Sequence, residues 1–297
     1  MKIILINRRT IKYISLVVTI LFILSLSSAL IAYSPITAFT EQQLEKSNDE
    51  VAVPIIMYHS VLKQSANLGK YVITPTELEN DLKYLSDRGY SAINMTELID
   101  YVYTGSPLPA KPVIITFDDG LYNNYAYGRP LLEKYKMKAV ISIVGKYSED
   151  YSIHPSTNLN YAHISWDQLK EITDSGYFEI QNHTYNMHST GVRLGTKRKR
   201  GESLEQYKMV LNSDISKLQQ KITLATGITP NTFTYPFGFI SKESEAILKD
   251  MGFKASLSCY EGVNKVKVGD TESLYQLKRK NRPHGVSTTQ FFKNFCP

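Results

Sequence analysis

Short apolar runs alternate with amphipathic stretches along most of the chain. The runs are four to six residues long and end at polar or glycine residues, which is typical of buried strands bounded by turns. They cover residues 53–58, 90–93, 113–117, 139–144, 178–181, 232–235 and 255–258. Strands separated regularly by helices predict an α/β fold around a parallel sheet.

Capping residues mark where several helices begin. Thr74 is followed by Pro75 and Glu77, so the threonine and glutamate side chains can satisfy free N–H groups at a helix start. Ser165 and Gln168 repeat this capping box. Apolar residues then recur at helical spacing. The predicted helices cover residues 75–88, 166–175 and 201–226.

The first 40 residues have a different pattern. Four basic residues precede an uncharged stretch whose most apolar part, residues 14–33, has the ~20 residues that a helix needs to cross a bilayer. Positive charge before the apolar run predicts that everything after it lies outside the cytoplasm. Small residues at the end of the run allow cleavage. Residues 1–40 therefore predict a membrane anchor or a signal peptide, residues 41–50 a polar linker, and residues 51–297 a globular domain.

Composition and charge exclude several classes of protein. With 42% apolar residues and 2 cysteines, the chain is neither a disordered segment nor a disulfide-stapled miniprotein. Its net charge is +6, but residues 41–297 hold 30 basic and 28 acidic residues, a net charge of only +2. Such a balance does not favour nucleic-acid binding. Cys259 and Cys296 lack metal-ligand spacing and either pair or stay free.

Polar residues of interest follow several predicted strands. Asp118 and Asp119 end one strand, and adjacent ionised carboxylates require positive charge nearby, although Asp–Gly is also an ordinary turn sequence. His183 and His188 follow another strand and are too far apart in angle to act together on one helix, so they must lie on a strand end and a loop. Two imidazoles and one carboxylate would leave an open position on a zinc ion. Each pair also has a purely structural interpretation.

Topology favours a common site for these residues. His59 and the turn at residues 235–238, with the sequence YPFG, also follow predicted strands. The carboxyl ends of parallel strands form one face of an α/β fold, and active sites lie there. We therefore expect the carboxylates, the histidines and the turn to converge.

Three motifs in this order resemble those of a known family: TFDDG at residues 116–120, HTYNMH at 183–188 and YPFG at 235–238. The chain resembles the NodB-type polysaccharide deacetylases, carbohydrate esterase family 4, from about residue 111 to the end. Residues 54–60, PIIMYHS, resemble the extra N-terminal strand of its extracellular members. The resemblance implies a distorted (β/α) barrel.

The resemblance also assigns roles to individual residues. It implies that Asp118 is the catalytic base, and that Asp119, His183 and His188 hold a divalent metal, most often Zn²⁺. It further implies that the backbone N–H of Phe237 contacts the oxyanion.

Two further assignments depart from the family pattern, and the position of His59 is open. Tyr235, placed with the substrate-binding residues, replaces an arginine that usually orients the base. No late Leu-His motif supplies the catalytic acid, so His284 is the candidate, against the alternative of a surface loop. His59 is expected either in the pocket wall or as a buried, hydrogen-bonded histidine.

The implied activity is hydrolysis of N-acetyl groups from N-acetylglucosamine units of a cell-envelope polysaccharide. The five-residue histidine spacing resembles the branch that contains poly-N-acetylglucosamine deacetylases; peptidoglycan and chitin fragments stay open as substrates. The alternatives are an O-acetyl esterase on xylan or a wall polymer, and an inactive carbohydrate-binding surface protein. The expected partners are the polysaccharide and, through residues 1–40, the membrane, with no nucleic acid and no evident protein partner. Residues 197–200, four cations, form either a solvated loop or a contact for anionic polymer or phospholipid.

Overall fold

The computed structural model describes residues 50–64 and 68–297. Residues Glu50–Pro297 form one compact unit. The predicted membrane segment lies outside the described residues. Within the described part of the chain, no helix combines the length and apolar character needed to cross a bilayer.

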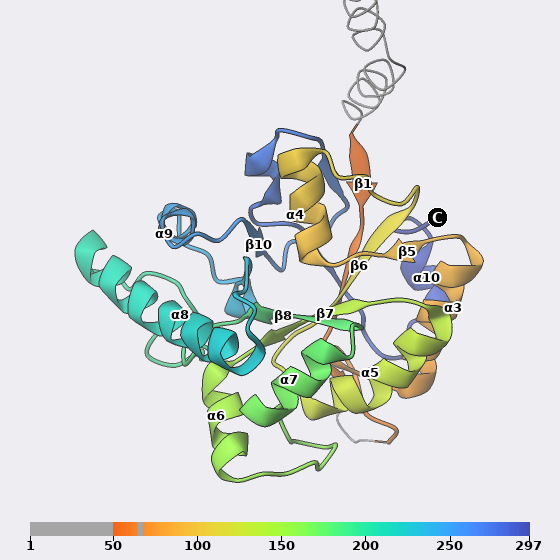
Figure 1. Cartoon of the computed structure of the whole chain (residues 1–297), viewed down its shortest axis with the longest axis horizontal. Coiled ribbons are helices and arrows are strands. Elements are labelled where there is room, and N and C mark those ends of the chain that lie inside the picture. Colours follow the sequence, from red (N-terminus) through yellow and green to blue (C-terminus); the bar gives the residue numbers. More distant parts are fainter. Residues whose placement is uncertain (1–49, 65–67) are drawn as a thin grey trace, which may run out of the picture. The chain divides into compact units, whose positions relative to one another are not determined.

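A curled parallel sheet forms the centre of this unit (Figure 1). Its strand order is β10-β9-β8-β7-β6-β2-β12, and β5 pairs with β6 beside this path. The strands are β2 (Ile55–Tyr58), β5 (Ser91–Ala92), β6 (Pro112–Phe117), β7 (Ala139–Ile143), β8 (Phe178–Asn182), β9 (Thr232–Thr234), β10 (Ala255–Leu257) and β12 (Lys280–Asn281). The predicted parallel α/β sheet is confirmed, and each of the seven apolar runs overlaps one of its strands. Strand β12 has no apolar run and was not predicted.

The segment that contains β12 bridges the two ends of the sheet. Leu277 exchanges backbone hydrogen bonds with Ser256 and Ser258 beside β10, at 2.8 and 2.9 Å. A few residues later, β12 pairs with β2 at the other end. Residues 277–281 therefore complete a distorted barrel. Because only two residues pair with β2 and both are polar, hydrophobic periodicity gives no sign of this connection.

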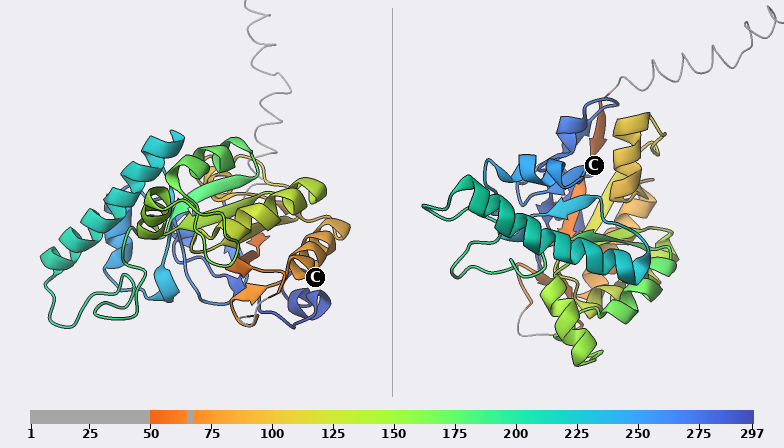
Figure 2. Two further views of the ribbon diagram at one scale, coloured as in Figure 1. Left: turned by 90° about the horizontal axis from the view of Figure 1, so that it is seen from below. Right: turned by 60° about the vertical axis from the view of Figure 1, so that its left-hand side comes forward.

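Helices cover the outside of the curled sheet, with α3, α5, α7 and α8 lying side by side (Figures 1 and 2). The helices are α3 (Pro75–Asp87), α4 (Met95–Thr104), α5 (Tyr122–Tyr135), α6 (Gly145–Ile153), α7 (Trp166–Asp174), α8 (Leu204–Thr226), α9 (Ser244–Asp250) and α10 (Thr288–Phe292). The predicted capping boxes of α3 and α7 are confirmed. Helix α8 begins at Leu204 rather than at residue 201, because Ser203 accepts the N–H of Gln206 as its cap.

Shorter elements fill the remaining chain. Strand β1 (Val51–Val53) pairs antiparallel with β11 (Asn264–Val266), and β3 (Ser60–Val61) pairs in parallel with β4 (Val72–Ile73). Two 3₁₀ turns, η1 (Pro236–Gly238) and η2 (Thr271–Leu274), complete the fold.

Both faces of the sheet are buried in apolar contacts. Ile114 of β6 packs with Ile55 on one face, whereas the next residue, Ile115, packs with Ile56 and Ile141 on the other. Successive strand residues point to opposite faces, so a strand buried on both sides is a continuous apolar run. This explains why the runs were visible in the sequence. Both cysteines are free thiols.

Candidate active site

The predicted polar residues converge on one cavity of about 530 Å³. The cavity lies beyond the carboxyl ends of β2, β6, β8 and β9, where the parallel sheet brings together residues from distant parts of the sequence. Its wall includes His59, Asp118, Asp119, His183, His188 and Phe237. The topological expectation that these features share one face is therefore confirmed.

The turn after β6 separates the two neighbouring carboxylates. Asp118 still follows the extended strand, and its backbone N–H donates to Tyr58 O at 3.0 Å. Asp119 and Gly120 then adopt left-handed backbone conformations, with φ of +74° and +71°. An aspartate in this region is uncommon outside special turns, and such strain concentrates at functional sites. The two carboxylates consequently meet different partners.

Asp119 faces the two histidines. Its Oδ1 lies 3.1 Å from Nε2 of His188 and 3.6 Å from Nε2 of His183. One potential ligand atom from each of the three residues lies within 4.8 Å of the others. Burial raises the pKa of the Asp119 carboxyl, but the neighbouring imidazoles outweigh burial and hold it well below its ordinary value. Asp119 is therefore an anion at neutral pH.

Two observations test whether these three residues fit a metal ion. Nδ1 of His183 lies 2.8 Å from the carbonyl oxygen of Thr234, which can only accept, so Nδ1 carries a proton and the neutral form of the ring presents its lone pair at Nε2. Oδ1 of Asp119 is buried and faces Nε2 of both histidines, and no other hydrogen-bond donor reaches it among the described residues. A buried anionic oxygen beside free imidazole nitrogens suits a divalent cation with an open coordination position. The donor set therefore fits a catalytic metal site.

The loop after β8 holds the second histidine in reach. Thr184 adopts φ of +72° and turns the chain out of the strand. The carboxylate of Asp214 on α8 then accepts the N–H groups of Tyr185 and Asn186 at 2.7 and 2.8 Å. The prediction that the histidines lie on a strand end and a loop is confirmed.

Asp118 is held by an arginine that the sequence analysis missed. Arg279, in the segment that bridges the sheet, donates to both carboxylate oxygens of Asp118 at 2.7 and 2.8 Å. Its Nε donates to Ser258 O, and Nη1 also reaches Thr116 Oγ1. Both charged side chains are almost completely buried. An arginine thus contacts Asp118, but it comes from the segment that bridges the sheet and not from the position before the YPFG turn.

This pair sets the charge of Asp118. Burial raises the pKa of the carboxyl, but the Arg279 guanidinium outweighs burial and lowers the pKa below its ordinary value. Asp118 is therefore ionised at neutral pH and able to accept a proton.

His59 lies in the cavity wall. Its ring lies against Tyr71, with centroids 4.7 Å apart, and its carbonyl oxygen accepts the side-chain amide of Asn124. The buried Nδ1 has no hydrogen-bond partner among the described residues. Burial lowers the pKa of this histidine despite the nearby Asp118 and Asp119. Of its two predicted environments, the pocket wall is confirmed.

The YPFG turn sends its two aromatic side chains in opposite directions. Phe237, with φ of +57°, is 44% exposed as a residue, and the centroid of its ring lies 4.3 Å from that of the His188 ring. Tyr235 is completely buried, and its hydroxyl lies 2.9 Å from Ser244 Oγ. Tyr235 does not line the cavity, so its expected substrate contact is corrected to support of the turn from the core.

His284 also lies away from the cavity wall. Its Nδ1 lies 2.8 Å from Glu77 Oε2, and the neighbouring Gly285 N–H donates to the same carboxylate. The histidine thus links the segment after β12 to the start of α3. Its expected position as the catalytic acid is not supported by these contacts.

The Gly120 turn gives a stability prediction. A Cβ on Gly120 would lie 2.9 Å from Ile143 Cγ2, whereas a Cβ on Gly89, at nearly the same φ, would meet no atom within 4 Å. We expect Gly120→Ala to lower the free energy of unfolding by about 2–4 kcal/mol, against about 1 kcal/mol for Gly89→Ala. Both variants place alanine at a positive φ, but only the Gly120 variant also places a Cβ against Ile143. Chemical denaturation of both variants measures the difference. Equal losses of unfolding free energy in the two variants would show that the Ile143 side chain shifts away from the new Cβ without lowering stability.

The comparisons with known proteins agree with this geometry. A family model described as polysaccharide deacetylase matches residues 105–256, just over half of the chain. The poly-beta-1,6-N-acetyl-D-glucosamine N-deacetylase of Staphylococcus aureus strain MSSA476 is 24% identical over 262 residues, 84% of this chain and 86% of that protein. The enzyme of the same name from Escherichia coli K12 is 23% identical over 247 residues, 77% of this chain but only 36% of its own length.

Solved structures share the fold. A de-N-acetylase from Aggregatibacter actinomycetemcomitans is 26% identical, with a TM-score of 0.68 over 82% of this chain and all of that one. IcaB from Ammonifex degensii is 25% identical, with a TM-score of 0.64 over 78% of this chain and 92% of that one. The Streptococcus pyogenes deacetylase PplD, at 21% identity and a TM-score of 0.67 over 84% of this chain and all of that one, supports the fold alone.

Proposed function

Because the chain belongs to the polysaccharide deacetylase family, we propose that it hydrolyses N-acetyl groups of N-acetylglucosamine units in a polysaccharide outside the cytoplasm. The observation that carries this proposal is the convergence of Asp118, Asp119, His183 and His188 in one cavity. The names of the Staphylococcus and Escherichia relatives favour a β-1,6-linked polymer as the first substrate to test, ahead of peptidoglycan. The predicted N-terminal anchor or signal would place the reaction at the cell surface.

Asp119, His183 and His188 would hold a divalent cation, with Zn²⁺ as the first candidate. When bound, such an ion supplies polarisation of the acetyl carbonyl and makes water more acidic. Asp118, ionised and fixed by Arg279, accepts the proton of the attacking water. The backbone N–H of Phe237 donates to the carbonyl oxygen as negative charge develops there, a contribution of about 3–4 kcal/mol for comparable donors.

The leaving nitrogen needs a proton, and we assign its delivery to His59 rather than to His284. His59 lies in the cavity with Asp118, whereas His284 is bonded to Glu77. Because burial lowers the pKa of His59, the imidazole is neutral before the reaction. The proton that it passes on is therefore the one released from the water, which Asp118 accepts first and which must move from Asp118 to His59 before it reaches the leaving nitrogen. The C–N bond breaks, and acetate and the free amine are the products.

A pair of histidine substitutions tests this assignment. We expect His59→Gln to lower kcat about 10²-fold, the usual contribution of a general acid, and His284→Gln to leave kcat unchanged. Acetate release under saturating substrate measures both. Loss of turnover in the His284 variant, with His59→Gln active, would return the acid to His284.

The activity itself is tested with the full chain in a neutral detergent. We expect acetate release from β-1,6-linked N-acetylglucosamine oligomers, its loss with a chelator, and its recovery when Zn²⁺ or another divalent ion is returned. Peptidoglycan fragments and O-acetylated xylan oligomers serve as parallel substrates. Release from the O-acetylated substrate alone would make the protein an esterase, and no release from any substrate would favour an inactive binding protein.

A further inference from the structure

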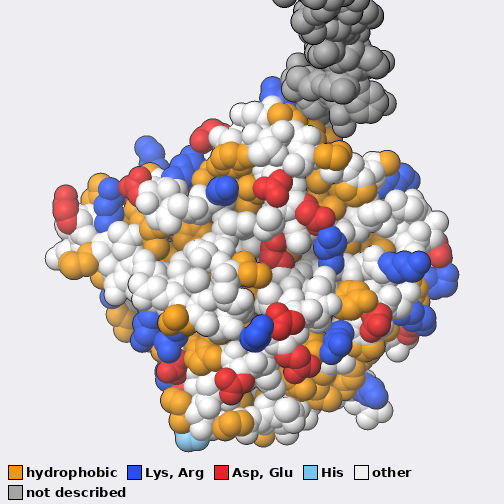
Figure 3. Space-filling view, viewed as in Figure 1, with side chains coloured by type: hydrophobic (Ala, Val, Ile, Leu, Met, Phe, Trp, Pro, Cys, Tyr) orange, Lys and Arg blue, Asp and Glu red, His pale blue; other side chains and the backbone are white. Residues whose placement is uncertain are grey.

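The loop at residues 193–202 accounts for the whole net positive charge of the domain. Residues 50–297 include 29 Lys+Arg and 25 Asp+Glu, a net charge of +4. Residues 193–202, between β8 and α8, include five cations and one carboxylate, which is also +4. The rest of the domain is therefore neutral, and basic and acidic side chains intermingle over the face seen in Figure 3.

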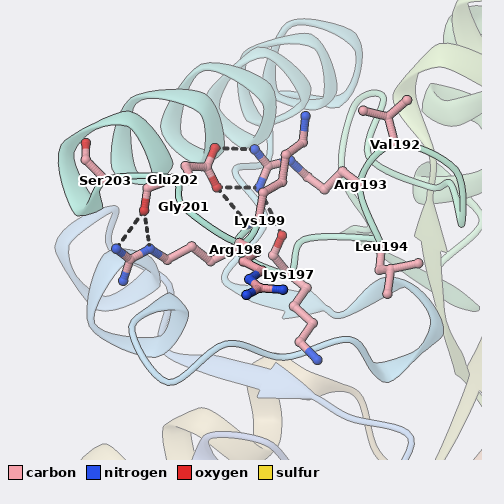
Figure 4. Close-up of a pocket in the computed structure, with 10 residues that line it drawn as sticks. Val192, Arg193, Leu194, Lys197, Arg198, Lys199, Gly201, Glu202 and Ser203 are labelled. Carbon is pink, nitrogen blue, oxygen red and sulfur yellow. Dashed lines mark hydrogen bonds and ion pairs between the residues drawn. The ribbon is translucent and has the colours of Figure 1, made fainter.

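Two of the five cations build the loop. Arg193 pairs with both carboxylate oxygens of Glu202 and donates to Lys197 O at 2.9 Å. Arg198 donates twice to the Glu202 carbonyl oxygen, at 2.9 and 2.7 Å, and pairs with Glu243. Figure 4 shows how these contacts gather around Glu202. These arginines are neutralised by their partners and hold the loop in a fixed shape.

The other three cations are exposed to solvent. The charged groups of Lys197, Lys199 and Arg200 make no hydrogen bond or close ion pair with any described residue, although Lys199 lies near enough to Glu202 to lower the pKa of that carboxyl. Together with the N-terminal cap of α8 they line an open groove of about 880 Å³ (Figure 4). Uncompensated cations around a groove raise the local concentration of anions, and arginine and lysine are the usual ligands of phosphate.

The groove is connected to the catalytic face. Its loop begins five residues after His188, and Thr196 Oγ1 donates to Phe239 O at 3.1 Å. The N–H of Arg198 donates to Ser241 Oγ at 2.8 Å. These bonds fix the loop to the chain that follows the Phe237 turn. The loop with the cations is therefore attached to the same segment of chain that contributes Phe237 to the cavity wall.

We propose that Lys197, Lys199 and Arg200 bind phosphodiester groups of an anionic polysaccharide and so hold that polymer beside the catalytic cavity. The proposal rests on the proposed function, because it specifies the charge of the polymer being deacetylated. A concave groove with a rigid, hydrogen-bonded frame and a connection to the catalytic face suits a polymer chain better than a flat lipid surface. A phosphate-bearing glycopolymer with N-acetylglucosamine units would therefore bind more tightly than the neutral β-1,6-linked oligomer, which remains a substrate of the same cavity.

A binding experiment tests the proposal with the full chain in a neutral detergent. The probe is a fluorescent glycerol phosphate oligomer, followed by anisotropy at several salt concentrations. We expect salt-sensitive binding that weakens about tenfold in the triple variant Lys197→Gln, Lys199→Gln, Arg200→Gln, as expected from three exposed charge contacts. Deacetylation of a neutral N-acetylglucosamine oligomer should be unchanged in this variant, because none of the three residues lines the cavity.

The control variant carries Lys136→Gln, Lys267→Gln and Lys293→Gln, which remove three exposed, unpaired cations elsewhere. It should bind the probe as the unmodified chain does. Equal weakening in both triple variants, or no weakening in the loop variant, overturns the proposal. So does loop-dependent retention on micelles that contain phosphatidylglycerol without binding of the oligomer, which would make the ligand a lipid headgroup. Absence of activity on the neutral oligomer bears on the proposed function and not on this binding.

Discussion

We expect Asp118→Asn to lower kcat at least about 10³-fold while the chain keeps its divalent ion, because the carboxylate accepts a proton and the amide does not. The amide has nearly the same shape and still accepts one hydrogen bond from Arg279. The candidate metal ligands Asp119, His183 and His188 are unchanged. Acetate release and metal content of the same preparation give the two readouts.

Asp81 offers a matched control for this substitution. Its carboxylate is as buried as that of Asp118 and is likewise held by an arginine, Arg282, at 2.7 and 3.2 Å. It does not line the cavity. Asp81→Asn should therefore lower stability and leave turnover per folded molecule unchanged. If Asp118→Asn kept turnover, or if both variants lost it equally, Asp118 would no longer be the base.

The sequence predicted those parts of the fold that depend on repeated local patterns. Strands that are buried on both faces appear in the sequence as apolar runs. The helices that begin after the N-cap residues Thr74 and Ser165 were predicted from their capping boxes. The convergence of Asp119 with His183 and His188 followed from parallel topology, because the strand ends share one face.

The remaining site residues depended on contacts that no local pattern encodes. Arg279 belongs to a short polar segment that is recognisable only once it closes the sheet beside β2. Tyr235 and Phe237 are neighbours in one turn, and a positive φ at Phe237 decides which ring reaches the cavity. His284 was the candidate acid, against a surface loop, because it is the only late histidine in the chain, but its contact with Glu77 holds it away from the cavity.

The Arg279–Asp118 pair leads to the second large effect. Arg279→Met leaves a carboxylate buried without its cation, so we expect the free energy of unfolding to fall by about 3–5 kcal/mol. Turnover of the folded molecules should fall as well, because Asp118 loses the two bonds that aim it at the water. KM for the acetylated oligomer should change little, since Arg279 does not line the cavity.

Arg282→Met separates these two consequences. Arg282 is 1% exposed and pairs with Asp81, so its removal should cost similar stability without affecting kcat. Arg279→Lys keeps the charge but cannot reproduce the two parallel bonds, and we expect it to recover stability in part and kcat only weakly. Denaturation curves and kcat at a temperature where all variants are folded provide the comparison. Equal kcat in the Arg279→Met and Arg282→Met variants would show that Arg279 is only a structural residue. A loss of kcat in the Arg279→Met variant alone would identify the bridging segment as the element that positions the base.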